Sequence, residues 1–321
     1  ARIIGLNAEI WLAIDQGRLR AVAGLLDRML DLLQEADRVN LWYHTTPPNR
    51  LPGLPGVVVP LARHAALLAR VAGDEPTPLR AMAVLSQAWC ALWRGQVAEA
   101  GQLLELADAD ARWSGSTGAV RSHQLLLAAL LAAIRGDADA ALEAAWTRVR
   151  EFEDGYGGRG RYLFRLLVAR VAAATGRLAE LREAWQQLEA ERALLDERQC
   201  AGSLRPREPI AAQLAWLQDR PADAIAGWRA ALQAEESIDL YGQAAETRLR
   251  LARALLRGGD AAAAAGLLVP LFERGRAEGG PGTELAGDLR THAVADAVLA
   301  ACQGTDEEVD AVVPHFHVRT H

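Results

Sequence analysis

The chain has 321 residues, of which 51% are hydrophobic, and it carries a formal net charge of −6. It therefore has ample apolar surface to bury a core, and an elongated repeat protein can reach this length without splitting into separate domains. The acidic balance, without a clustered basic segment, argues against nucleic-acid binding by this chain.

Cysteine usage and the length of the apolar runs indicate where the protein works. Cys90, Cys200 and Cys302 lie far apart and none forms a CxxC pair, which is typical of a reducing compartment, so we expect a cytoplasmic protein. The longest apolar run, residues 125–134, is too short to span a bilayer, and no membrane partner is predicted. The chain opens on Ala-Arg-Ile-Ile without an initiator Met or a signal-peptide leader. We therefore expect a piece of a longer protein or a processed form.

One phrase recurs along the chain: an apolar helix ends at a turn residue, and a second helix begins at once with small residues. The phrase reads AWCALWRGQVAEA around Gly95 and ALLAAIRGDADAA around Gly136, and these two glycines are 41 residues apart. The turn residues of the later copies are Gly176, Asp219 and Gly258. They follow in steps of 40, 43 and 39 residues. Self-similarity at this period predicts a helical-repeat solenoid.

Small residues recur at fixed distances from these turns, seven and four residues before and five residues after. A large apolar residue often stands nine residues after the turn, as Trp185 and Trp228 do. Small residues let two helices approach closely, and the large residue fills the space beyond them. Gly17 lies 78 residues before Gly95, which leaves room for two more units. We predict an all-α, right-handed, tetratricopeptide-like solenoid of about seven helix pairs of roughly 40 residues each over residues 1–302.

Two segments interrupt the predicted repeat. Residues 44–60 contain five prolines and two glycines and predict a loop, and the glycine-rich segment 155–160 predicts a second break. A short helix is expected over 61–72 and a last helix over 284–302, and residues 303–321 are expected to form an acidic turn and a tail. The predicted helix pairs are 2–16 with 18–39, 79–94 with 97–113, 119–135 with 138–153, 161–175 with 178–199, 208–218 with 222–236, and 239–257 with 261–277.

Two short segments bear a superficial likeness to chemical sites. GYGGRG at 155–160 resembles a phosphate-binding glycine loop, but no strand precedes it, no GKS or GKT follows, and all 35 basic residues are arginine. An ordinary interhelical loop is the preferred interpretation. His315, His317 and His321 could chelate a metal, but no cysteine or carboxylate of matching spacing accompanies them, which favours a frayed terminus. No catalytic constellation is visible, so no enzyme activity, cofactor or metal is predicted.

Positions two, three, six, ten and thirteen residues before each turn are predicted to face the concave groove. They place tryptophan, arginine, glutamine and histidine on an apolar wall, a mixture that suits a small organic ligand or a peptide. Some of these tryptophans could instead pack against the next repeat, because the helices are longer than those of a repeat of about 34 residues. The predicted ligand-binding residues are Trp11, Trp89, Trp93, His123, Arg170, Gln213, Trp216 and Arg248. They form an N-terminal cluster around Trp89 and Trp93 and a central one around Arg170, Gln213 and Trp216.

The phrase Ala-Leu-x-x-Gly-(Asp/Arg)-x-x-x-Ala, seen in AIRGDADAA, ATGRLAELREA and LRGGDAAAA, resembles the sensor region of MalT-like, LuxR-type large ATP-binding transcriptional regulators. The likeness covers most of residues 1–302. In that family the superhelix receives the inducer between an N-terminal nucleotide-binding module and a C-terminal helix-turn-helix. The resemblance therefore implies a non-enzymatic effector-sensing domain, with a small-molecule inducer or regulatory protein as partner and with flanking ATPase and helix-turn-helix modules in the full-length protein. The alternative is a tetratricopeptide-like scaffold, unrelated to transcription, that binds a protein or peptide.

We expect this chain alone neither to hydrolyse ATP nor to bind duplex DNA. No glycine-lysine loop is present to hold phosphates, and an acidic surface gains little from the release of counterions. Phosphate release measures the first half of the prediction and a mobility shift at low salt the second. Sub-micromolar binding to duplex DNA would contradict it.

Overall fold

The computed structural model describes residues 2–16, 18, 20–35, 58–93, 96–115, 118–155, 157–195, 207–237 and 241–278. Helices cover 89% of these residues and no strand occurs among them, which confirms the predicted all-α class. The α-helices are α1 (Arg2–Asp15), α2 (Arg20–Glu35), α4 (Val58–Ala72), α5 (Pro78–Trp93), α6 (Val97–Ser114), α7 (Gly118–Ile134), α8 (Ala138–Phe152), α9 (Gly158–Thr175), α10 (Leu178–Arg192), α12 (Arg207–Leu217), α13 (Pro221–Ser237), α14 (Tyr241–Arg257) and α15 (Ala261–Glu278). A short 3-10 helix, η2 (Glu153–Gly155), follows α8.

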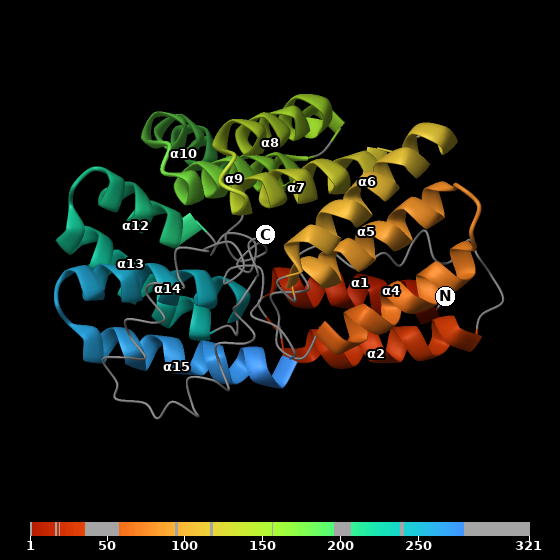
Figure 1. Ribbon diagram of the computed structural model, residues 1–321, viewed down its shortest axis with the longest axis horizontal. Coiled ribbons are helices and arrows are strands. Elements are labelled where there is room, and N and C mark those ends of the chain that lie inside the picture. Colours follow the sequence, from red (N-terminus) through yellow and green to blue (C-terminus); the bar gives the residue numbers. More distant parts are fainter. Residues whose placement is uncertain are drawn as a thin grey trace.

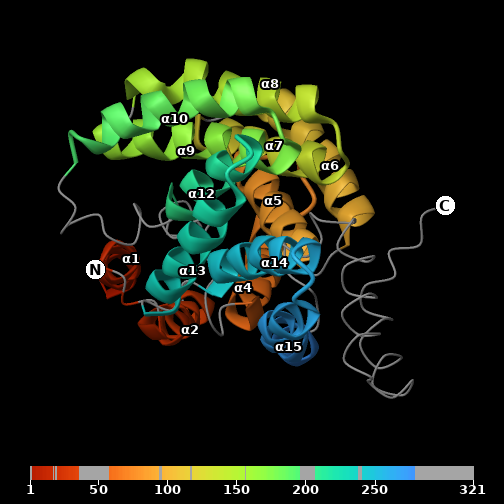
Figure 2. The ribbon, with the colours of Figure 1, turned by 90° about the vertical axis from the view of Figure 1, so that its left-hand side faces the viewer.

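Successive helices pack in pairs, and the pairs follow one another around a superhelical turn (Figure 1). From α5 onward the pairs are α5 with α6, α7 with α8, α9 with α10, α12 with α13, and α14 with α15. The first helices also contact one another, α5 against α7, α7 against α9, and α9 against α12. Figure 2 shows α7 and α9 on the inner side of the bend, with α8 and α10 outside them. We call α5, α7, α9, α12 and α14 the inner layer, and their partners the outer layer.

Most predicted helix bounds agree with the structure to within three residues, and the differences have local causes. The helix predicted over 61–72 begins earlier, at Val58. The break predicted over 155–160 is shorter, because α9 already begins at Gly158 and the Gly157 carbonyl accepts from the N–H groups of Gly160 and Arg161. The predicted extension of α10 to 199 is wrong, since the helix ends at Arg192. The helix predicted over 284–302, the tail 303–321 and residues 44–57 lie outside the described residues.

Each inner helix ends in the same backbone turn. The N–H that follows the turn residue donates to the carbonyl four residues before the turn residue, the closure of a Schellman motif. This motif needs a left-handed residue at the turn, which glycine adopts without strain and aspartate tolerates. The left-handed turn residues in the described repeats are Gly136, Gly176, Asp219 and Gly259.

The turn of the last pair is Gly259, and the predicted Gly258 is wrong by one residue. Gly259 has a φ of 84°, and the side chain of Asp260 then caps α15 by accepting from the N–H of Ala263 at 3.1 Å. The Gly-Asp dipeptide at 136–137 forms the same turn and cap before α8. Gly-Asp, not Arg-Gly, is therefore the equivalent phrase, and every equivalent position in α14 and α15 moves by one residue.

With this register, the predicted rows of small residues form the contact between the two helices of each pair. The position five residues after the turn is completely buried in all five pairs, and the position seven residues before it is at most 4% exposed. These residues are Ala100, Ala141, Leu181, Ala224 and Ala264 in the first row and Ala88, Ala129, Ala169, Ala212 and Ala252 in the second. Nine residues after the turn, Trp228 and Leu268 are buried and Trp185 is half-buried. The close approach that the alanines permit is the reason the repeat is visible in the sequence.

An ion pair closes the open end of three consecutive helix pairs, opposite the turn. An arginine fifteen residues before the turn position meets a carboxylate fifteen residues after it. The three pairs, which we call clasps, are Arg80 with Asp110 at 3.0 Å, Arg121 with Glu151 at 3.2 Å, and Arg161 with Glu191 at 3.1 Å. Each clasp joins an inner helix to its outer partner.

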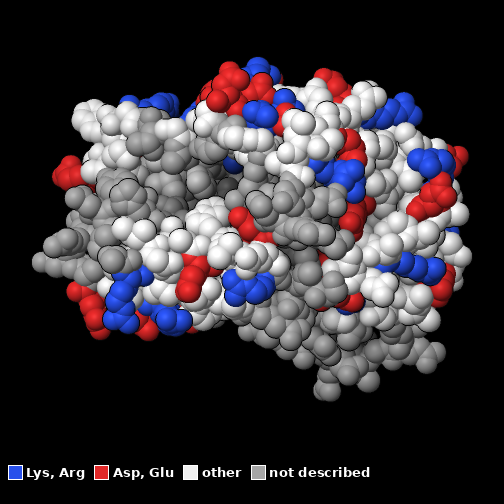
Figure 3. Space-filling view, turned by 180° about the vertical axis from the view of Figure 1, so that it is seen from behind, with Lys and Arg blue, Asp and Glu red and all other residues white. Residues whose placement is uncertain are grey.

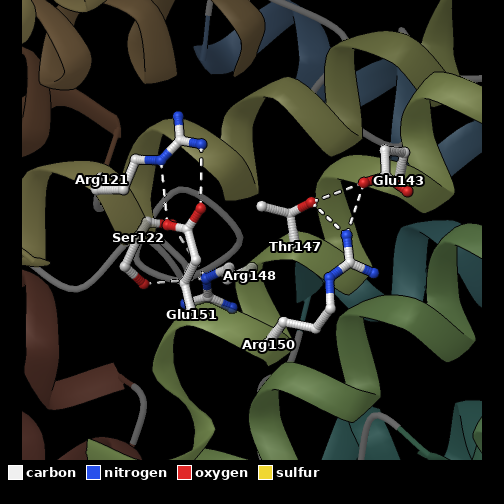
Figure 4. Close-up of polar contacts among 7 residues, drawn as sticks. All are labelled: Arg121, Ser122, Glu143, Thr147, Arg148, Arg150 and Glu151. Carbon is white, nitrogen blue, oxygen red and sulfur yellow. Dashed lines mark hydrogen bonds and ion pairs between the residues drawn. The ribbon is translucent and has the colours of Figure 1, made fainter.

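Figure 4 shows the second clasp and the contact beside it. Arg121 approaches Glu151 with two nitrogens, and Nε of Arg148 donates to the carbonyl and the hydroxyl oxygen of Ser122 at 3.0 and 3.1 Å. The guanidinium carbon of Arg148 also lies 4.3 Å from the centroid of the Phe164 ring. Arg148 therefore connects its own helix, α8, to α7 and to α9 of the next pair.

The first two clasps should differ in their contribution to stability. Asp110 is only 4% exposed in its side chain, whereas Arg121 and Glu151 are 42% and 39% exposed. Removing Arg80 leaves a buried carboxylate without its cation, so we expect Arg80→Leu to lower the free energy of unfolding by about 3 kcal/mol. Arg121→Leu should cost less than about 1 kcal/mol. Urea unfolding followed by circular dichroism measures both, and equal losses would show that burial of the clasp does not matter.

Candidate ligand-binding surface

The eight residues predicted to line the groove lie in different environments. Trp89 is buried, and the side chain of Trp93 lies outside the described residues. The other six are half-buried: Trp11, His123, Arg170, Gln213, Trp216 and Arg248. Trp11 belongs to α1 and His123 to α7, so they come from a different part of the superhelix than Gln213 and Trp216 on α12.

Trp89 belongs to the hydrophobic core, which corrects its predicted place in the groove. Its side chain is 7% exposed and shares one buried cluster with Leu85 and Leu92. Helix α5 packs against α4, α6 and α7. The indole Nε1 of Trp89 is buried without a hydrogen-bond partner. We therefore assign Trp89 to packing.

Arg248 lies among three helices rather than at an inner position. Its guanidinium donates to the Leu267 carbonyl of α15 at 3.3 Å and pairs with Glu236 of α13. The register of the last pair explains this placement, because Arg248 stands eleven residues before Gly259, outside the predicted inner positions. Arg248 therefore holds α14 against both neighbouring outer helices.

The same change of register places two other arginines of α14 at inner positions. Arg253 stands six residues and Arg257 two residues before Gly259. The guanidinium carbon of Arg257 lies 5.3 Å from the centroid of the Trp216 ring, so side chains from consecutive inner helices meet here. The sequence prediction missed both residues because it took Gly258 as the turn. Alignment of the Gly-Asp dipeptides would have found them.

Trp216 is held in place from one side and half-open on the other. Its ring centroid is 5.7 Å from that of Trp228, with 45° between the ring planes, and Trp228 is buried on α13. Gln213 is half-buried one helical turn earlier on α12. An indole face can stack on flat or apolar groups, and the amide and guanidinium supply directional hydrogen bonds. We call Gln213, Trp216, Arg253 and Arg257 the α12–α14 site.

Charge is divided unevenly between the two layers. The inner layer contains eleven arginines and two carboxylates, whereas the outer layer contains eight arginines and sixteen carboxylates. Helices α1 and α2, which precede these pairs, do not share the bias. The inner-layer arginines that pair with outer-layer carboxylates or with η2 are Arg80, Arg121, Arg161, Arg165, Arg207 and Arg248. Helices α9 and α14 contain the most arginines of the inner layer, four each.

The face of the molecule seen in Figure 3 shows no comparable separation of positive from negative charge. On the face seen in Figure 3, arginine and carboxylate side chains are interspersed, with no broad area of one sign among the coloured residues. Within the described ranges, no group of three or more His, Cys, Asp and Glu side chains is placed to hold a metal ion. None of the described helices is both long and apolar enough to cross a membrane.

No protein-family model and no curated protein matches the chain. Its structure is similar to that of a Rap protein solved in complex with Competence and Sporulation Factor. The TM-score is 0.57, the match covers 86% of this chain and 76% of that chain, and 12% of the residues are identical. At this identity the likeness concerns the fold alone, and it confirms the tetratricopeptide-like helical solenoid.

Substitutions of Trp89 test its assignment to the core. Trp89→Ala removes a large buried side chain and should lower the free energy of unfolding by about 3–5 kcal/mol. Trp89→Phe should cost much less, because the phenyl ring keeps most of the apolar contact and removes an N–H that has no partner. Thermal unfolding measures both, with the half-buried Trp216→Ala as the comparison. If the Trp89→Ala variant were as stable as the Trp216→Ala variant, the assignment of Trp89 to the core would be wrong and Trp89 would be assigned to the surface.

Proposed function

We propose that this chain is a tetratricopeptide-like scaffold that binds a peptide or an extended protein segment along its inner layer, at a surface that includes the α12–α14 site. The observation that carries the proposal is the unbroken series of contacts between inner helices, from α5 through α7 and α9 to α12. Stacked helix pairs of this kind form extended concave surfaces that such proteins use for binding. The complex of the similarly folded Rap protein with Competence and Sporulation Factor supports a binding role for the fold.

The chemistry of the α12–α14 site suits a peptide. The indole of Trp216 can cover an apolar side chain, and the Gln213 amide can both donate to and accept from a peptide group. Packing of Trp216 against the buried Trp228 restricts its movement before a ligand arrives, which lowers the entropy lost on binding. The proposal assigns the chain binding and no catalytic step.

A finer proposal concerns the biological context. The repeat phrases that resemble MalT-like regulators support a place for the chain as the effector-sensing region of a transcriptional regulator, with a small-molecule inducer or a regulatory protein as its ligand. The gene sequence on both sides is the test. A P-loop ATPase upstream and a helix-turn-helix downstream are expected. A complete reading frame that encodes neither module would contradict this finer proposal, and only the scaffold function would remain.

Selection from a random peptide library tests the scaffold function directly. Displayed peptides are panned against the immobilised full chain, and labelled synthetic copies of the recovered peptides are measured by fluorescence anisotropy. We expect saturable binding that Trp216→Ala weakens by about tenfold, since one aromatic contact is lost. Trp113→Ala is the matched control, because Trp113 is 80% exposed on the outer helix α6. Failure to enrich any peptide, or equal losses in the two variants, would contradict the proposal.

A further inference from the structure

We infer that the exposed face of α1 is a contact between two copies of this chain, in which the two α1 helices pack antiparallel. The inference concerns a different surface from the α12–α14 site and does not depend on the proposed peptide binding. The face contains Ile4, Ala8 and Leu12, which follow one another at intervals of four residues and therefore share one side of the helix. The large apolar residues Ile4 and Leu12 are 51% and 49% exposed. A single copy thus leaves an apolar stripe in contact with water.

Helix α1 has the register of an inner helix. The N–H of Arg18 donates to the carbonyl of Ala13 at 2.8 Å, which is the bond that closes the turn after each later inner helix. Residue 17 is therefore the turn position of α1, and Ala8 and Leu12 stand nine and five residues before it. Helix α2 packs against α1 as its outer partner. Each position of α1 can thus be compared with the same position of the later inner helices.

In the later inner helices, these two positions pack on the preceding helix pair. Leu127 and Leu131 of α7 belong to the hydrophobic cluster formed mainly by α1 to α6. Ile210 and Leu214 of α12 contact the cluster of α7 to α10 in the same way. None of the inner-layer residues five positions before the turn is exposed: Cys90, Leu131, Val171, Leu214 and Ala254. Because α1 is the first helix of the structure, its equivalent face meets no preceding pair and is open to another helix.

A second copy of the chain is the occupant that the sequence of α1 favours. Ile4 and Leu12 are placed symmetrically about Ala8. In an antiparallel pair centred on Ala8, Ile4 therefore meets Leu12 of the partner subunit, and apolar side chains cover one another at both ends. The small Ala8, with open space beside Gly5, lets the two helices approach closely. One two-fold contact covers the stripes of both copies, so the assembly closes as a dimer.

The charges at the edge of the stripe fit the antiparallel arrangement. Arg2 and Glu9 are exposed and seven residues apart, which places them along the same edge of α1. In the antiparallel pair, Arg2 stands about 8 Å along the helix axis from Glu9 of the partner subunit, within reach of two long side chains. A parallel pair would place Arg2 beside its own equivalent, where like charges repel. Antiparallel packing also sets the two helix dipoles in opposite directions.

Sedimentation velocity of the full chain over a range of concentrations measures the contact. One pair of helices lies at the small end of specific interfaces, so we expect a dimer with a dissociation constant on the order of 10 μM. Leu12→Glu puts a charge into an apolar contact and should weaken the dimer by at least about tenfold. Leu106→Glu, at a 40% exposed leucine of α6, is the matched control and should leave the dissociation constant unchanged. Thermal unfolding of both variants checks that the fold is intact.

A charge exchange tests the antiparallel arrangement. Arg2→Glu alone and Glu9→Arg alone each bring like charges together across the contact and should weaken the dimer by about threefold. The double variant Arg2→Glu/Glu9→Arg should recover the dissociation constant of the wild type. A chain that remains monomeric well above the expected constant would overturn the inference and leave the face to a helix of another protein. A dimer that Leu12→Glu leaves intact, or a double variant no better than the single ones, would also overturn it.

Discussion

The structure depends on one steric constraint, the close contact of two helices across each turn. A small residue stands seven positions before the turn and faces the position five residues after the turn. This second position is completely buried in every described pair from α5 to α15. A larger side chain at either place would force the helices apart and open the core. The left-handed turn residue sets the chain direction that makes this contact possible. Because the constraint recurs with every pair, it imposes a period on the sequence.

That period is the reason the fold could be predicted and the site could not. Helix pairs are recognised from many positions at once, so an error of one residue at Gly258 left the fold assignment unchanged. Whether a side chain faces the groove depends on the register of its own helix alone. The same error of one residue placed Arg248, which joins α14 to α13 and α15, at an inner position. It left out Arg253 and Arg257, which stand at inner positions. Trp89 shows a second limit: how deeply a side chain is buried depends on all the helices around α5, and a repeat pattern describes only two of them.

The clasps add a long-range regularity to this local one. Their spacing of fifteen residues on each side of the turn is visible in the sequence only after the turns have been aligned, because no local pattern links Arg80 to Asp110. The clasps close the end of the pair that the turn does not hold. The backbone motif and the ion pair thus constrain opposite ends of three successive pairs, and burial decides how much each ion pair contributes.

The clasps also explain how one distribution of charge can serve both the fold and a binding surface. An arginine on an inner helix is stabilised by a carboxylate on its outer partner, so the clasps by themselves require basic inner helices and acidic outer ones. Toward α14 the bias continues, although the clasp positions of that pair hold Ala244 and Arg274 and cannot form the ion pair. Two of the four arginines there, Arg253 and Arg257, stand at inner positions, and Arg257 stacks on Trp216. The charge pattern that stabilises the first pairs therefore extends to the last pair, where Arg248 pairs with Glu236 of α13 and Arg257 stacks on Trp216 of α12.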